Sequence, residues 1–212
     1  MSSVFDWSIK QFLKEAASSA PTPGGGSISA LCGSLGAAMV SMVANLTIGK
    51  EKYKDVESEM KGMLEEINNL LEKFEGLVAA DMAAFNDFMA VFKLPKDTEE
   101  QKTARTRRMQ EALVKATDTP LAIAEACKRV LELANEAASK GNEGAVSDAG
   151  VAAFLSEAAL NAALLNVDIN VPSIKDTAYV EEAVNRRREL SRQAAAIKEQ
   201  AIAAVARRLG GG

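Results

Sequence analysis

The sequence predicts an all-α protein, a bundle of about five to seven helices that includes long antiparallel helices. Apolar residues recur at the three- and four-residue spacing of a helix along most of the 212 residues. The two-residue alternation that marks a half-buried strand is nearly absent. With 48% hydrophobic and 25% charged residues, a chain of this length can bury a sizeable core. We therefore expect a single helical domain over residues 1–212.

The first predicted element is a short amphipathic helix near residues 3–18. Its apolar side carries Phe5, Ile9, Phe12 and Ala16. The helix ends at the segment SAPTPGGGS, residues 19–27, because prolines and glycines interrupt helices.

A second helix is expected at residues 27–47, with Ser27 as its N-cap. Residues 28–48 carry no charge and so meet the length criterion for a membrane span. Several serines, Asn45 and Thr47 make this segment only weakly apolar, and the sequence suggests no second segment of this kind. We therefore expect a helix buried on all sides, whose small residues let neighbouring backbones approach closely, and we expect no membrane partner.

The third helix, from Met60 to just before Pro95, has the most regular apolar stripe in the chain. Its members are Met60, Leu64, Ile67, Leu71, Phe74, Val78, Asp81, Phe85, Phe88 and Phe92. A lone carboxylate on such a stripe must be hydrogen-bonded, paired or protonated, because an unpaired buried charge costs several kcal/mol. Asp81 is thus either a registry residue, that is, a buried polar residue that fixes how the helices align, or a carboxylate whose raised pKa suits it to proton transfer.

Three further helices are predicted from their start and stop signals. Thr98 and Gln101 form a capping box at the start of a helix that kinks or breaks around Pro120 and stops near Gly141. A second small-residue helix covers about residues 148–166, and the segment VDINVPS ends it. The last helix covers about residues 174–209.

Composition excludes several classes of function. The chain has no histidine, the commonest general base and metal ligand, so we expect no metal site. The net charge of -4 gives no field that attracts nucleic acid. Cys32 and Cys127 lack any paired-cysteine spacing, and no targeting signal is evident, so we expect reduced thiols and a cytoplasmic location.

The glycine segment TPGGGS lacks the lysine of a phosphate-binding loop and the strand and spacing of a dinucleotide-binding fingerprint. It precedes a predicted buried helix, whose first backbone N–H groups can hold an oxyanion, a carboxylate or a polar ring edge. The segment is either a simple turn into the helix or a cradle for a ligand.

Three segments occur in order along the chain: SSAPTPGGGSISALCGSLGAAMVSMVANLTIGKEKY, DMAAFNDFMAVFKLPKDTEEQKTAR and VSDAGVAAFLSEAALNAALLNVDIN. Together they resemble the formiminotransferase-cyclodeaminase C-terminal domain family, which includes stand-alone methenyltetrahydrofolate cyclohydrolases of bacterial one-carbon metabolism. The segment PTPGGGS, the pair D-x-x-A-F and LPK, and NV-x-x-N are the marks of this family. The resemblance covers almost the whole chain.

The resemblance implies an all-helical domain that works as a dimer or larger assembly, with a homodimer expected, and that acts on tetrahydrofolate-bound one-carbon units. The folate is the substrate, and no other cofactor is implied. By the same resemblance, Asp81 is the catalytic acid and base. The residues implied in substrate binding are Pro23, Gly24, Gly25, Gly26, Ser27, Lys50, Asp148 and Asn166. Ala79 stands where the family often has a second acidic residue, so a supporting group must come from elsewhere.

Hydrolysis of 5,10-methenyltetrahydrofolate to 10-formyltetrahydrofolate is the preferred function, because no formiminotransferase domain is attached within these residues. The alternative enzyme is formiminotetrahydrofolate cyclodeaminase, which forms a similar bridged carbon and expels ammonia. A non-catalytic folate-binding or scaffold protein, with Asp81 as a registry group, is the alternative of another class.

Overall fold

A computed structural model describes residues 3–210, and Gly211 and Gly212 lie outside this range. Within it are six α-helices and no strands, which confirms the predicted all-α class. The helices are α1 (Ile9–Ala16), α2 (Gly25–Thr47), α3 (Glu57–Val91), α4 (Glu99–Lys140), α5 (Val146–Asn170) and α6 (Thr177–Leu209). Four short 3-10 helices cover Val4–Asp6, Glu51–Val56, Glu143–Ala145 and Val171–Ser173.

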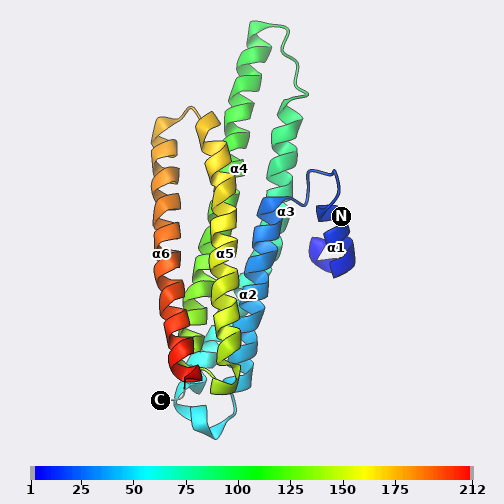
Figure 1. Ribbon diagram of the computed structural model, residues 1–212. Coiled ribbons are helices and arrows are strands. Elements are labelled where there is room, and N and C mark those ends of the chain that lie inside the picture. Colours follow the sequence, from blue (N-terminus) through cyan, green and yellow to red (C-terminus); the bar gives the residue numbers. More distant parts are fainter. Residues whose placement is uncertain (1–2, 211–212) are drawn as a thin grey trace.

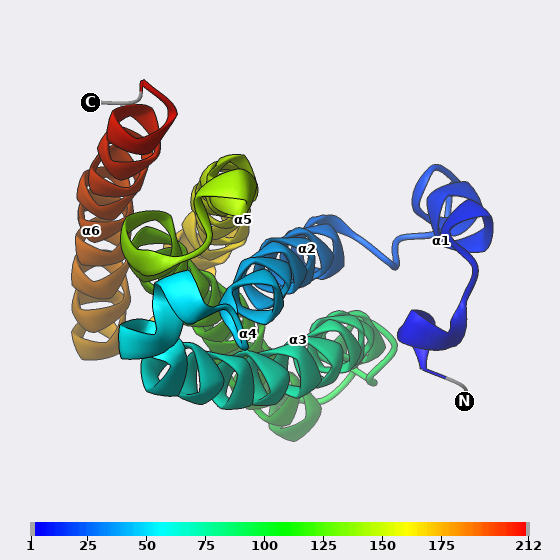
Figure 2. The same cartoon turned by 90° about the horizontal axis from the view of Figure 1, so that it is seen from below.

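Helices α2 to α6 form one elongated bundle, in which α4 packs against all four of the others (Figure 1). Helix α2 lies between α3 and α5, and α6 covers the opposite side of α4 and α5 (Figure 2). The short α1 stands away from the bundle, beside the start of α2. The end of α3 and the start of α4 extend beyond the other helices as a protruding pair (Figure 1).

Helix α2 is the buried small-residue helix that the sequence predicts, but it begins at Gly25 rather than Ser27. Gly24 is its N-cap, so the prediction of Ser27 as the cap is wrong. The close approach is visible at Gly33, where an added Cβ would lie 2.7 Å from both Cys127 Sγ and the Phe74 ring. Real Cβ atoms are essentially never this close to other atoms, so α2 fits into the bundle only with glycine here.

Within residues 3–210, two helical segments and not one are long and apolar enough to cross a membrane, namely Gly25–Thr47 and Glu143–Ser173. The expectation that no second segment of this kind exists is therefore wrong. About half of each apolar stretch, 56% and 50%, is buried inside the bundle. Core helices of a bundle have this property, since they are covered by their neighbours.

The sequence predicts a kink or a break at Pro120, and the break is wrong, because helix α4 continues through this residue. Proline has no N–H and therefore leaves the carbonyl of Ala116, one turn earlier, without its helical partner. The side-chain amide of Asn170 donates to this carbonyl at 2.9 Å. Because α5 extends to Asn170, beyond the predicted end at residue 166, it supplies the missing donor.

Candidate active site

Asp81 lies where the start of α2, the middle of α3 and the end of α5 meet. The Ser27 hydroxyl, from the first turn of α2, donates to Asp81 Oδ2 at 2.8 Å. An added Cβ on Gly26 would lie 2.1 Å from Asp81 Oδ1, so the carboxylate lies directly against the main chain. On Gly25 the same atom would lie 3.6 Å from the Asn166 amide group. The structure thus brings the glycine segment, Asp81 and Asn166 together.

The first N–H groups of α2 are the source of hydrogen-bond donors at this point. The first four N–H groups of a helix have no partner within it, and the helix dipole is positive at this end. Pro23, Gly26 and Ser27 are buried, while Gly25 is exposed. At the start of α2, the buried residues Gly26 and Ser27 therefore lie against Asp81, while Gly25 faces solvent.

Asp81 is half-buried, and burial raises the pKa of its carboxyl above the usual value. Hydrogen bonds from the Ser27 hydroxyl and the Ser27 backbone lower the pKa and partly offset this effect. No ion pair involves Asp81 in the described part of the chain. The carboxylate is therefore held by donors without being neutralised by a cation, which leaves it able to accept a proton.

A single chain does not bring Lys50 or Asp148 to Asp81. Lys50 follows the far end of α2 and is exposed, about 35 Å along the helix from Gly25. Asp148 lies in the first turn of α5, about 27 Å along this helix from Asn166. Of the three polar residues implied outside the glycine segment, only Asn166 lies at the site.

In the part of the chain that the structure describes, no second carboxylate supports Asp81. Ala79 is exposed on α3, and no acidic residue contributes to the pKa shift of Asp81. Ser27 supplies the support instead. Within residues 3–210, no group of three or more His, Cys, Asp or Glu side chains is placed to hold a metal ion.

Three phenylalanines near the site are not the core residues that their spacing suggests. Phe85 and Phe88 are half-buried and Phe92 is 52% exposed. Helix α2 begins at the level of Asp81, so the apolar stripe of α3 has no α2 residues to cover it beyond this point. The Phe88 and Phe92 rings pack edge to face at 5.3 Å, and the Arg105 guanidinium lies 5.9 Å from the Phe92 ring centre.

Fold and site together define a helical-bundle protein in which a half-buried carboxylate is held against a glycine-rich helix start. The model of the family described as Formiminotransferase-cyclodeaminase matches residues 8–189. The chain belongs to this family.

Relatives and a solved structure agree with this assignment. The chain is 46% identical to a methenyltetrahydrofolate cyclohydrolase from Methylorubrum extorquens, over 91% of this chain and 92% of that protein. It is 33% identical to a formimidoyltransferase-cyclodeaminase from Rattus norvegicus, and the matched region is 36% of that protein. The crystal structure of a formiminotetrahydrofolate cyclodeaminase from Thermotoga maritima superposes with a TM-score of 0.86 at 29% identity, covering 95% of this chain and 97% of that chain.

Proposed function

We propose that this protein hydrolyses 5,10-methenyltetrahydrofolate to 10-formyltetrahydrofolate. The observation that carries the proposal is the half-buried Asp81 carboxylate, bonded to Ser27 and in contact with Gly26. The relative from Methylorubrum extorquens, which matches over nearly its whole length, supports the cyclohydrolase reaction over the alternatives.

Asp81 performs two tasks in the proposed reaction. Its ionised carboxylate offsets the positive charge of the methenyl bridge and takes a proton as water adds to the bridging carbon. The product of this step is a neutral tetrahedral carbon that bears a hydroxyl group between N5 and N10. Asp81 then gives the proton to N5 as the bond from carbon to N5 breaks. The hydroxyl proton leaves as the formyl C=O forms, so one proton is released overall.

The groups around Asp81 position the substrate. The first N–H groups of α2 offer donors beside the carboxylate, where an oxygen on the bridging carbon develops its charge. The Asn166 amide lies beside Gly25 and donates to the carbonyls of Ala162 and Ala163, so it lines the site without offering a free N–H group. Ser27 fixes one carboxylate oxygen, because its hydroxyl donates to Oδ2 and leaves Oδ1 nearest to Gly26.

Assays of the purified protein with two substrates test this function. We expect loss of 5,10-methenyltetrahydrofolate with formation of 10-formyltetrahydrofolate. The Thermotoga maritima structure favours cyclodeaminase as the second candidate. Ammonia release from formiminotetrahydrofolate without methenyl hydrolysis would reverse the choice, and no turnover of either substrate would favour the scaffold alternative.

We also propose that the protein is a homodimer that uses the exposed apolar stripe of α5. Its members are Val151, Phe154, Ala158, Ala162, Leu165 and Ile169, all exposed. They recur at helical spacing, and Leu165 and Ile169 are 64% and 75% exposed. Ile28 and Leu35 of the adjacent α2 continue the apolar surface. Large contiguous apolar patches of this kind mark interaction sites.

The double variant Phe154→Asp, Leu165→Asp tests the dimer. Light scattering of the wild type should give twice the mass of one chain, and the variant should give the mass of one chain. Two charges placed in an apolar interface are costly to bury, whereas the same substitutions on a free surface change the stability of the fold very little. The control Glu65→Asp, Glu72→Asp changes exposed residues of α3 and should remain dimeric. A wild type that is monomeric, or a variant that is still dimeric, would contradict the proposal.

The location that we propose is the cytoplasm. Cys32 and Cys127 are both free thiols, and Cys127 is buried. Free thiols persist in a reducing compartment.

The partner that we propose is a small folate substrate and not a nucleic acid, because the net charge of -4 offers nucleic acid no attraction.

A further inference from the structure

The start of α2 lies between side chains from two other helices. Gly25 lies beside Asn166 of α5, since an added Cβ would be 3.6 Å from the Asn166 amide group, and Gly26 lies against Asp81 of α3. The direction of the first N–H groups of α2 therefore depends on both neighbours. Asp81 belongs to the interior of α3, whereas Asn166 is close to the last residue of α5. The position of the start of α2 thus depends on how firmly the end of α5 is held.

The last turn of α5, residues 166–170, has little apolar burial to hold it. Within this turn only Val167 is buried, and Asp168 and Ile169 are exposed. The Asp168 carboxylate pairs with Arg187 of α6 at 2.8 Å, but partly exposed ion pairs of this kind contribute little to stability. Contact with the core therefore fixes this turn at a single residue.

Asn170 adds a directional contact between this turn and α4. Its side-chain amide donates at 2.9 Å to the Ala116 carbonyl, which Pro120 leaves without a helical partner. Asn170 and Ala116 are both half-buried, so loss of the bond would leave a poorly solvated carbonyl without a donor. Asn166 lies one turn before Asn170, about 6 Å along the same face of α5. The bond thus holds the part of α5 that reaches the site.

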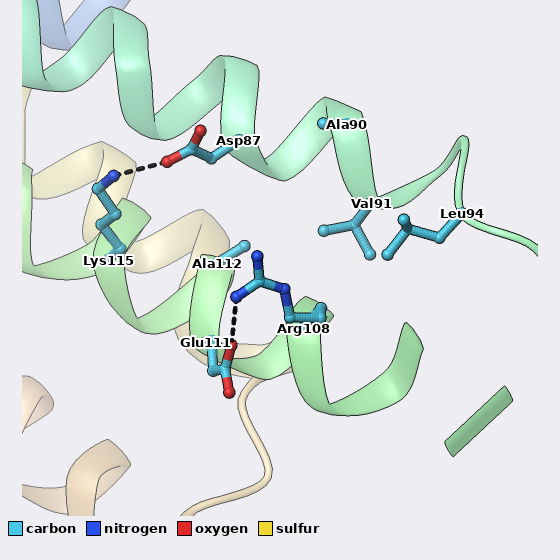
Figure 3. A pocket seen from close by; sticks show the side chains of 8 residues that line it. All are labelled: Asp87, Ala90, Val91, Leu94, Arg108, Glu111, Ala112 and Lys115. Atoms are coloured by element: carbon cyan, nitrogen blue, oxygen red, sulfur yellow. Dashed lines mark hydrogen bonds and ion pairs between the residues drawn. The ribbon is translucent and has the colours of Figure 1, made fainter. Parts of the chain in front are cut away.

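Ala116 lies on the part of α4 that also contacts α3. Figure 3 shows Lys115 of α4 paired with Asp87 of α3, and the two charged groups are 2.6 Å apart. Both residues line a cavity of about 360 Å³ between the two helices. Asp87 follows Asp81 by less than two turns of α3. One stretch of α4 therefore contacts the helix that carries Asp81 and, through Asn170, the end of α5.

We propose that Asn170 is a positioning residue of the active site, which ties the end of α5 to α4 and thereby keeps Asn166 against Gly25. The inference rests on the proposed function, because it takes the start of α2 beside Asp81 as the place where the bridging carbon reacts. Asn170 acts through Asn166 and not on the substrate. Without the tie, the start of α2 loses its fixed neighbour on one side, and a displacement of about 1 Å costs about 10²-fold in rate.

The variant Asn170→Ala tests the tie. We expect kcat to fall about 10- to 10²-fold with a KM close to that of the wild type, because the alignment of the reacting groups changes and not the binding of the rest of the folate. The thermal unfolding midpoint should also fall, since the Ala116 carbonyl loses its donor. Steady-state kinetics well below this midpoint reports on the folded enzyme. The control Asn69→Ala removes an exposed asparagine amide from α3 and should change neither quantity.

The double variant Pro120→Ala, Asn170→Ala separates positioning from stability. Alanine at position 120 has an N–H group that donates to the Ala116 carbonyl within α4, so the thermal midpoint should return toward that of the wild type. The end of α5 stays untied, so kcat should stay as low as in Asn170→Ala. The single variant Pro120→Ala should keep wild-type kcat, because a carbonyl oxygen has two lone pairs and can accept both donors.

Failure of the positioning role and failure of the function give different results. The positioning role alone is overturned by wild-type kcat in Asn170→Ala, by a raised KM at unchanged kcat, or by a kcat that recovers together with the thermal midpoint in the double variant. Absence of turnover of both folate substrates by the wild type overturns the proposed function and the inference with it.

Discussion

The variant Asp81→Asn should lose about 10²- to 10⁴-fold in kcat for methenyl hydrolysis, the typical contribution of a general acid or base. Asparagine has nearly the same shape as aspartate and can still accept the Ser27 hydroxyl. It cannot take up the water proton or offset the charge of the methenyl bridge. Initial rates at saturating substrate measure the loss directly.

The pH dependence of the wild type should report the same group. The ionised carboxylate is the active form, so kcat/KM should fall as the pH drops through the pKa of Asp81. Because burial raises this pKa, the fall should occur at a higher pH than for an exposed aspartate. In Ser27→Ala one of the groups that lower the pKa is removed, so the fall should move to still higher pH.

Stability measurements separate loss of chemistry from loss of fold. A carboxyl group with a raised pKa in the folded state destabilises the fold as the pH rises through this pKa. Asp81→Asn removes this ionisation, so its thermal unfolding midpoint at neutral pH should equal or exceed that of the wild type. A stable, folded Asp81→Asn variant with wild-type kcat would show that Asp81 is only a registry residue.

The apolar stripe of α3 shows what spacing alone can predict about this site. A single acidic residue among apolar ones singles out Asp81, because a charge in that position needs an explanation in either a partner or a function. The structure supplies the partner, Ser27, from a residue 54 positions away in the sequence. No local pattern encodes such a contact, since it depends on how α2 lies against α3. Without knowledge of this contact, the sequence suggests only a local role for Ser27, that of an N-cap.

Contacts between distant segments also account for the other differences. A proline predicts a break in α4, yet the break depends on whether another group replaces the lost hydrogen bond, and Asn170 does so for Ala116. Similarly, the helical spacing of Phe85, Phe88 and Phe92 predicts that they are buried. Burial requires a neighbouring helix, but α2 begins at the level of Asp81 and does not extend alongside these three residues. Spacing gives the face of a helix, and tertiary packing decides what covers that face.

The variant Gly26→Ala should lose about 10²-fold in kcat/KM, although it adds only one methyl group. Its Cβ would lie 2.1 Å from Asp81 Oδ1 and 2.6 Å from Asp81 Cγ, closer than atoms can pack. Because Gly26 is held in the first turn of α2, the Asp81 carboxylate is the group that has to move. A displacement of about 1 Å in a catalytic group is enough to cost about 10²-fold in rate. The measurement is steady-state kinetics on the purified variant.

The matched control is Gly76→Ala, which makes the same change in α3 at a position where an added Cβ meets nothing within 4 Å. Alanine is preferred to glycine within a helix by about 1 kcal/mol, so this variant should be fully active and slightly more stable. If Gly26→Ala is instead as active as Gly76→Ala, the contact between the carboxylate and the main chain does not position Asp81. Retained activity would then require Asp81 to work from a different rotamer, away from the start of α2. In that case Ser27→Ala would leave the pH profile unchanged, so the two variants test the same geometry from independent sides.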